Sequence, residues 1–133
     1  MYLSEELQSF LIEQYWLNYR LSTGNRQEWL AAKELTFWAG QEVRSAAVEA
    51  REGVMDLLIA LAEYVADDDR ALSYLGAGEI EDLLSHHANE FIDQIDTAAR
   101  RFTSFRMALR AAWFDSFLPS EQALRLRSFG PTY

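Results

Sequence analysis

Apolar residues recur at helical spacing along most of the chain, and this pattern constrains the fold more than any other feature. Positions 54, 57, 58, 61 and 65, for example, would share one face of a helix. No segment shows the strict alternation of apolar and polar residues expected of a half-buried strand. Only six glycines and two prolines interrupt the 133 residues. The sequence therefore predicts an all-α fold, a compact bundle of about six to seven helices in a single domain over residues 1–133.

Caps and turn residues predict the helix boundaries. Ser4 is placed to cap a first helix that runs to about Leu21, and the second helix is expected to end near Gly40. We expect Asp69 to cap a short helix, and the run Gly76-Ala77-Gly78 to break the chain. The remaining helices are expected over about 50–66, 70–75, 79–101 with a bend near Ala88, 104–114 and 120–127, and residues 41–49 receive no assignment.

A faint internal repeat suggests an alternative arrangement of the bundle. A shift of 34 residues superposes apolar positions, for example Leu57 on Phe91 and Ala71 on Phe105. That spacing suits two solenoid-like helix hairpins. Two unrelated amphipathic hairpins of similar length would coincide in the same way, and stable solenoids usually need three or more repeats.

The charge of the chain is strongly negative and unevenly distributed. Twenty-one acidic and twelve basic residues give a net charge of −9, and residues 67–98 alone carry nine acids and one base. Such a field repels the phosphates of nucleic acids. It attracts basic protein surfaces, although it also serves simply to keep a protein in solution. A protein partner with a basic surface is therefore expected, and a nucleic-acid partner is not.

Several classes of site are excluded or disfavoured by composition and motifs. The absence of cysteine excludes thiol catalysis, disulfides and cysteine-ligated metals. The first residues lack a signal-peptide pattern, and the longest apolar stretch, 54–66, contains two acids and is too short to span a bilayer. The acids at 67–69 lack calcium-loop spacing, and no Gly-x-Ser-x-Gly motif occurs. We expect a cytoplasmic protein with no membrane partner, cofactor, metal or catalytic residue.

The segment from Leu72 to His87 reads LSYLGAGEIEDLLSHH. It resembles a bacterial family of uncharacterised small helical proteins whose signature reads Gly-Ala-Gly-Pro-Leu-Glu-Asp-Leu-Leu. Glu79 stands in place of the proline of that signature, and Ile80 replaces its first leucine. Further likeness at 91–93 and at Ala112-Trp113 extends the resemblance over roughly residues 54–114. It implies a helical fold and a bacterial origin, and the family has no established activity to transfer.

An acidic strip is the first candidate site. Asp82, His86 and Glu90 follow one another at a spacing of four and would share one face of a continuous helix. A histidine between two carboxylates could ligate a metal or act as a general base, but a partner-binding face, and still more a simply solvated face, explains the pattern better. His87 instead falls on the apolar stripe, where we expect it to be hydrogen-bonded and partly buried. The candidate partner-binding residues of this strip are Glu79, Glu81, Asp82, His86, Glu90 and Asp93.

The first helix carries a second candidate surface. Besides its main apolar stripe it has another stripe on a different side, made of Ile12, Tyr15, Trp16 and Tyr19. A helix that is apolar on two sides is either enclosed within the fold or presents one side to another chain. Tyrosine and tryptophan are enriched in interface hot spots. The sequence leaves both alternatives open.

These features predict a small acidic protein-binding module without enzymatic activity, of which an immunity-type or inhibitor protein docking on a basic partner is one instance. The first alternative is a homo-oligomeric structural or regulatory protein that uses the first helix as its dimer seam. The second alternative is a metal-binding or hydrolytic protein that uses Asp82, His86 and Glu90.

Overall fold

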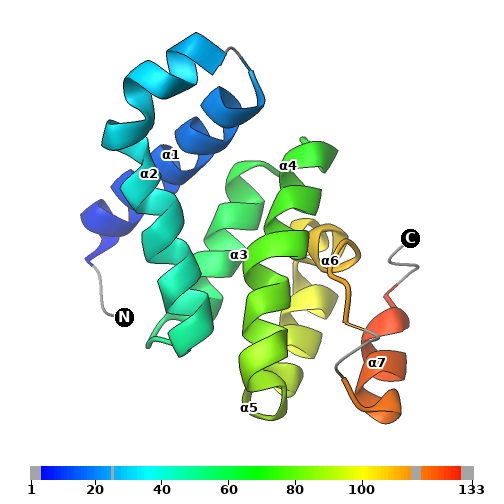
Figure 1. The fold of residues 1–133 in the computed structure, drawn as a ribbon. Helices are drawn as coiled ribbons and strands as arrows, with labels where there is room; N and C mark the ends of the chain where they lie inside the picture. The colour runs from blue at the N-terminus through cyan, green and yellow to red at the C-terminus, as the bar shows by residue number, and fades with distance from the viewer. Residues whose placement is uncertain (1–3, 25, 115–117, 130–133) are drawn as a thin grey trace.

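The computed structural model of the chain describes residues 4–24, 26–114 and 118–129. For residues 26 and 28–35 it describes the backbone alone. Within these ranges the structure is helical and has no strand, which confirms the predicted all-α class (Figure 1). No helix of the described part combines the length and the apolar character needed to cross a membrane. The helices are α1 (Glu5–Thr23), α2 (Arg26–Glu49), α3 (Val54–Tyr64), α4 (Asp69–Leu75), the π-helix η1 (Gly76–Ile80), α5 (Glu81–Arg101), α6 (Thr103–Leu109) and α7 (Ser120–Arg127).

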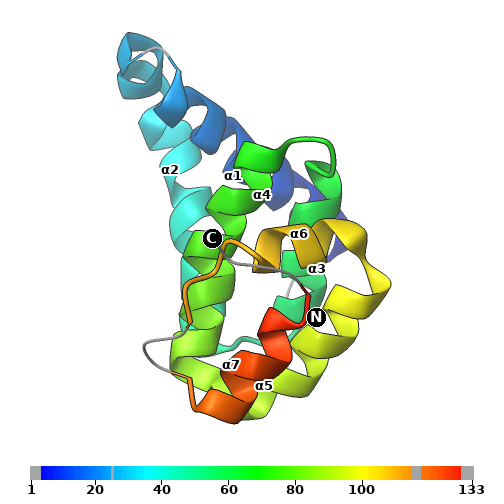
Figure 2. The ribbon, with the colours of Figure 1, turned by 90° about the vertical axis from the view of Figure 1, so that its right-hand side faces the viewer.

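The first two helices form a hairpin whose tip projects beyond the other helices (Figures 1 and 2). As predicted, Ser4 caps α1, and its hydroxyl oxygen accepts a hydrogen bond from the Leu7 amide at 3.3 Å. The predicted end of the second helix near Gly40 is wrong, because α2 continues to Glu49. The continuation buries Val43 and two alanines completely, and this packing outweighs the helix-weakening effect of one glycine.

Left-handed backbone separates α2 from α3. Ala50 has a φ of 51° and Gly53 a φ of 83°, so the third helix begins at Val54 and not near residue 50. The next helix is capped by Asp68, one residue before the predicted Asp69, and the Asp68 carboxylate accepts a hydrogen bond from the Ala71 amide at 3.1 Å.

The run Gly76-Ala77-Gly78 does not break the chain, which corrects the sequence-based prediction. The π-helix η1 joins α4 directly to α5, so that the three form one long continuous element (Figure 1). Gly76 has ordinary helical backbone angles, and it is needed for a close contact between helices. A β-carbon at Gly76 would lie 1.7 Å from the carbonyl oxygen of Ala108 in α6.

A kink at His87 divides α5. The φ of −141° and ψ of 32° at this residue are not helical, which agrees with the predicted bend near Ala88. Nε2 of the partly buried His87 lies 2.7 Å from the carbonyl oxygen of Val48, so the predicted environment of this histidine is confirmed. Because of the kink, Asp82 and Glu90 do not belong to one uninterrupted helix.

The hydrophobic core is contiguous from Leu11 in α1 to Leu126 in α7. A shift of 34 residues carries both bounds of α4 onto those of α6, and these two helices pack against each other. Whether the chain contains a true repeat stays open. The helix predicted over 104–114 is shorter in the structure, where α6 ends at Leu109. That the whole chain is one domain stays a prediction.

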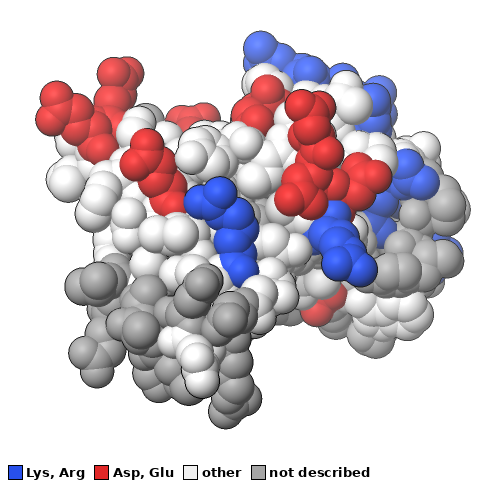
Figure 3. All heavy atoms as spheres, turned by 90° about the horizontal axis from the view of Figure 1, so that it is seen from above, with Lys and Arg blue, Asp and Glu red and all other residues white. Residues whose placement is uncertain are grey.

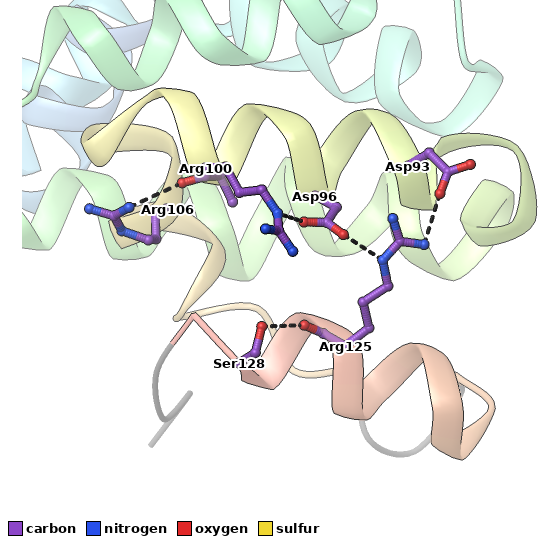
Figure 4. Close-up of polar contacts among 7 residues, drawn as sticks. Asp93, Asp96, Arg100, Arg106, Arg125 and Ser128 are labelled. Carbon is purple, nitrogen blue, oxygen red and sulfur yellow. Dashed lines mark hydrogen bonds and ion pairs between the residues drawn. The ribbon is translucent and has the colours of Figure 1, made fainter.

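The last helix, α7, starts after Pro119 as predicted and lies along α5 (Figure 2). Arg125 reaches from it to two carboxylates of α5 (Figure 4): its Nη1 lies 2.8 Å from Asp93 Oδ1 and its Nε 2.5 Å from Asp96 Oδ2. On the other side of Asp96, the Nε of Arg100 lies 2.7 Å from Oδ1. Burial alone would raise the pKa of Asp96, but the hydrogen bonds from both guanidinium groups outweigh it and hold this pKa below its ordinary value.

We expect Arg125→Gln to lower the free energy of unfolding, because the nearly buried Asp96 loses one of its two charged donors. Since the pKa of Asp96 is lowered in the folded state, its stabilising contribution is present above the ordinary value of 3.8 and is lost as the pH falls below it. Urea denaturation at pH 7 measures the effect. Arg70→Gln, at an exposed position of α4, is the matched control, and an equal loss in both variants would contradict the assignment.

Candidate functional site

The second apolar stripe of α1 lies inside the fold. Ile12 is 8% exposed and Tyr15 and Trp16 are each 2% exposed, because α1 is packed against both α2 and α3. The indole Nε1 of Trp16 donates a hydrogen bond to the Leu61 carbonyl oxygen of α3 at 3.1 Å. This corrects the partner-surface alternative for these three side chains, which are not available to another chain or to a dimer seam. Tyr19, at the end of the stripe, is partly buried.

The hydroxyl of Tyr15 donates a hydrogen bond to Oε2 of Glu79, a residue of η1. Glu79 is only 8% exposed, so it does not belong to an open acidic strip, as the sequence pattern had indicated. A π-turn holds one residue more than an α-turn and therefore changes the direction in which its side chains point. Single π-turns inside longer helices are frequent at functional sites.

The environment of Glu79 changes its proton affinity. Burial raises the pKa of Glu79 to about 7 from its ordinary 4.5, and the charge of Asp82 adds to the rise, while the Tyr15 hydrogen bond and the charge of Arg44 partly oppose it. Burial, followed by the charge of Glu79, raises the pKa of Tyr15 well above 10. Tyr15 therefore remains a proton donor at neutral pH, where Glu79 changes its charge.

Glu79 lines a hollow of about 540 Å³ that lies between α1, α2 and the α4–η1 segment, and that we call the Glu79 pocket. The aromatic side chains at its rim are Phe37, 49% exposed, and Tyr74, 42% exposed. Gly40 forms part of the wall. The polar side chains of the lining are Asn18, Gln41, Arg44, Ser45 and Glu79.

A larger hollow of about 750 Å³ borders the other side of Tyr74. Its carboxylates, Asp68 and Asp69, are exposed, and Asp68 is already engaged as the cap of α4. The Glu79 pocket differs because its carboxyl group is buried and its pKa is shifted toward neutrality. A pocket with convergent polar groups and a perturbed ionisable residue is the strongest candidate site in a fold of this kind.

The rest of the acidic strip is held in several separate interactions. Glu81 Oε1 accepts a hydrogen bond from the Trp113 amide at 2.5 Å, and Asp82 Oδ2 lies 3.9 Å from Nε of Arg44. Asp93 is engaged by Arg125 of α7, as described above. On the face seen in Figure 3, acidic and basic side chains are interspersed and do not form a field of a single sign.

The structure does not assemble the metal or catalytic group of the second alternative. Nδ1 of exposed His86 lies 2.9 Å from the backbone carbonyl oxygen of Asp82, and Glu90 lies beyond the kink, with Oε2 3.7 Å from Nδ1 of His87. Among the residues that the structure describes, no three histidine or carboxylate side chains come together in a way that could hold a metal ion.

Over residues 26–127 the chain matches the model of DUF6869, a family of unknown function. The chain belongs to DUF6869. The DUF6869 match includes η1 with Glu79 and the part of the pocket that α2 contributes, and it begins after α1, so that Tyr15 and Asn18 lie outside it. It agrees with the expected membership of an uncharacterised family. No curated protein and no solved structure is similar enough to the chain to count as a match.

Proposed function

We propose that the protein is a small acidic binding module that docks on a basic protein partner through the Glu79 pocket and its rim. The observation that carries the proposal is a buried carboxyl group at the wall of a pocket whose rim exposes Phe37 and Tyr74. Interface hot spots typically combine aromatic anchors with a desolvated polar group. The net charge of −9 would accelerate the approach of a basic partner.

One instance of such a module is an immunity-type or inhibitor protein that covers the phosphate-binding groove of a cationic toxin such as a nuclease. We further propose that the protein is cytoplasmic and of bacterial origin, and that the sequence of Gly76–Leu84 is a signature shared within its family. Two residues of the acidic strip, the partly buried Asp82 and the exposed Glu90, would supply long-range attraction around the pocket.

Homo-oligomerisation is the second candidate function, and it requires a different face of α1 from the one first considered. Leu7 and Phe10 are 56% and 50% exposed. The ring of Phe10 stacks on that of Trp38 in α2, with 5.9 Å between the centroids. An exposed apolar surface of this kind suits contact with a second copy.

Site-specific photocrosslinking in the native host tests both candidates. With a benzophenone amino acid in place of Phe37, we expect a crosslink to a basic protein, lost when about 0.5 M salt is added before irradiation because the attraction is screened. The same probe in place of Leu124, an exposed residue of α7, is the matched control and should give no such product. An acidic partner, or equal capture at both positions, would contradict the proposal, and a self-crosslink from position 10 would support the dimer instead.

A further inference from the structure

We propose that the Glu79 pocket binds a primary ammonium group at the end of an alkyl chain, such as the side chain of a lysine. The inference deepens the proposed function and rests on it for the source of the ammonium group, which would be a lysine of the docked partner. A free alkylamine offers the same chemistry, and the experiment below distinguishes the two sources.

The lining of the pocket favours a cation. Glu79 is buried by the fold and lines the pocket. An ionised carboxylate in such a place is costly unless an opposite charge approaches it. The rings of Phe37 and Tyr74 stand at the rim, and the faces of aromatic rings attract organic cations. A cationic group on a slender apolar stem could both approach the buried carboxylate and pass between the aromatic rings.

The hydrogen bond from Tyr15 selects the kind of cation. Because Oε2 of Glu79 already accepts the Tyr15 hydroxyl proton, one lone pair of that oxygen is engaged, which disfavours a ligand that needs both carboxylate oxygens. A guanidinium group binds carboxylates most strongly through two parallel hydrogen bonds, one to each oxygen. An ammonium group acts as a compact point charge and needs only one carboxylate oxygen. The geometry therefore favours lysine over arginine.

Arg44 lines the pocket but does not neutralise Glu79. Its side chain is 72% exposed, and its Nε lies 3.9 Å from Asp82 Oδ2. Its charge opposes the rise in the pKa of Glu79 without cancelling it. Arg44 therefore competes electrostatically with an incoming ammonium group, so its removal should strengthen the binding of that group.

The groups around Glu79 determine how binding depends on pH. Glu79 faces Tyr15 from α1, Arg44 from α2, Tyr74 from α4 and Asp82 from α5. Burial raises the pKa of both tyrosines, so their hydroxyl groups stay neutral near pH 7. Glu79, with a pKa of about 7, must lose its proton to attract the ammonium group. Affinity should therefore fall about tenfold between pH 8 and pH 6.

The test is an NMR titration of the full chain with Nα-acetyl-lysine methylamide, whose Nε-acetylated derivative is the uncharged control. We expect amide shifts around the pocket with the charged compound, an at least tenfold weaker affinity in Glu79→Gln, and a stronger affinity in Arg44→Gln. Glutamine keeps an oxygen acceptor for Tyr15, so the variant removes charge and not the hydrogen bond. Glu121→Gln on α7, the same change away from the pocket, should bind like the wild type.

Equal binding of both lysine derivatives, or an unchanged affinity in Glu79→Gln, would overturn the ammonium site whether or not a protein partner exists. A parallel titration with 1,5-diaminopentane separates the sources of the ligand. Binding of the lysine compound supports a lysine of a partner. Binding of the diamine alone would keep the ammonium site and remove the partner's lysine as its ligand, which counts against the proposed docking function.

Discussion

Gly76→Ala is expected to lower the free energy of unfolding by about 3 kcal/mol or more, because the new methyl group has no space. A β-carbon at this position would lie 1.7 Å from the carbonyl oxygen of Ala108, 2.7 Å from its carbonyl carbon and 3.2 Å from the β-carbon of Ala111. The nearest two are backbone atoms, which cannot turn away as a side chain can. The α4–η1 segment would have to move away from α6 and open the core between them. Urea denaturation measures the loss.

Gly78→Ala is the matched control, two residues further along the same π-helix. No atom lies within 4 Å of a β-carbon built there. Alanine also restricts the unfolded chain more than glycine does, so we expect no change or a gain of up to about 1 kcal/mol. Similar stability of the two variants would show that the contact between Gly76 and α6 does not restrict the helices.

The contrast between these glycines explains one failure of sequence-based prediction. A glycine-rich run is typical of a turn, but glycine also permits two helices to approach closely. The deciding atom, the Ala108 carbonyl oxygen, belongs to another helix, and no local pattern points to it. Two local features were predicted correctly because they need no information from other helices. The cap at Ser4 and the start of α7 after Pro119 depend on neighbouring residues alone.

The candidate site was predictable only in part. Spacing placed Glu79 among the acids of one strip and Tyr15 on an apolar stripe, and both assignments followed from the residues nearby. Their hydrogen bond joins positions 64 residues apart, and a helix pattern contains no information about such a contact. The aromatic rim was missed entirely, since Phe37 and Tyr74 belong to separate helices and no pattern relates them. The bend near Ala88, by contrast, was predicted, and the structure places it at His87, where it separates Asp82 from Glu90.

Glu79→Gln is expected to raise the free energy of unfolding at pH 8 and to change it little at pH 5. The folded-state pKa of Glu79, about 7, lies above its ordinary value of 4.5. Its contribution to stability is therefore fully present below about pH 4.5 and is lost as the pH rises through 7, when a buried carboxylate must carry its charge. The gap of about 2.5 pH units corresponds to a loss on the order of 3 kcal/mol. Glutamine stays neutral and avoids that loss.

Denaturation of both proteins at pH 5 and pH 8 measures this effect, with Glu121→Gln as the control for a change of net charge. Asp96 does not interfere, because its pKa is lowered and its contribution changes only below its ordinary value of 3.8. If Glu79→Gln follows the wild type at both pH values, the buried carboxyl group does not titrate near neutrality. If the wild type alone weakens at pH 8, an alkylammonium ligand should restore part of its stability there and none in the variant, because a ligand that binds only the folded state stabilises it.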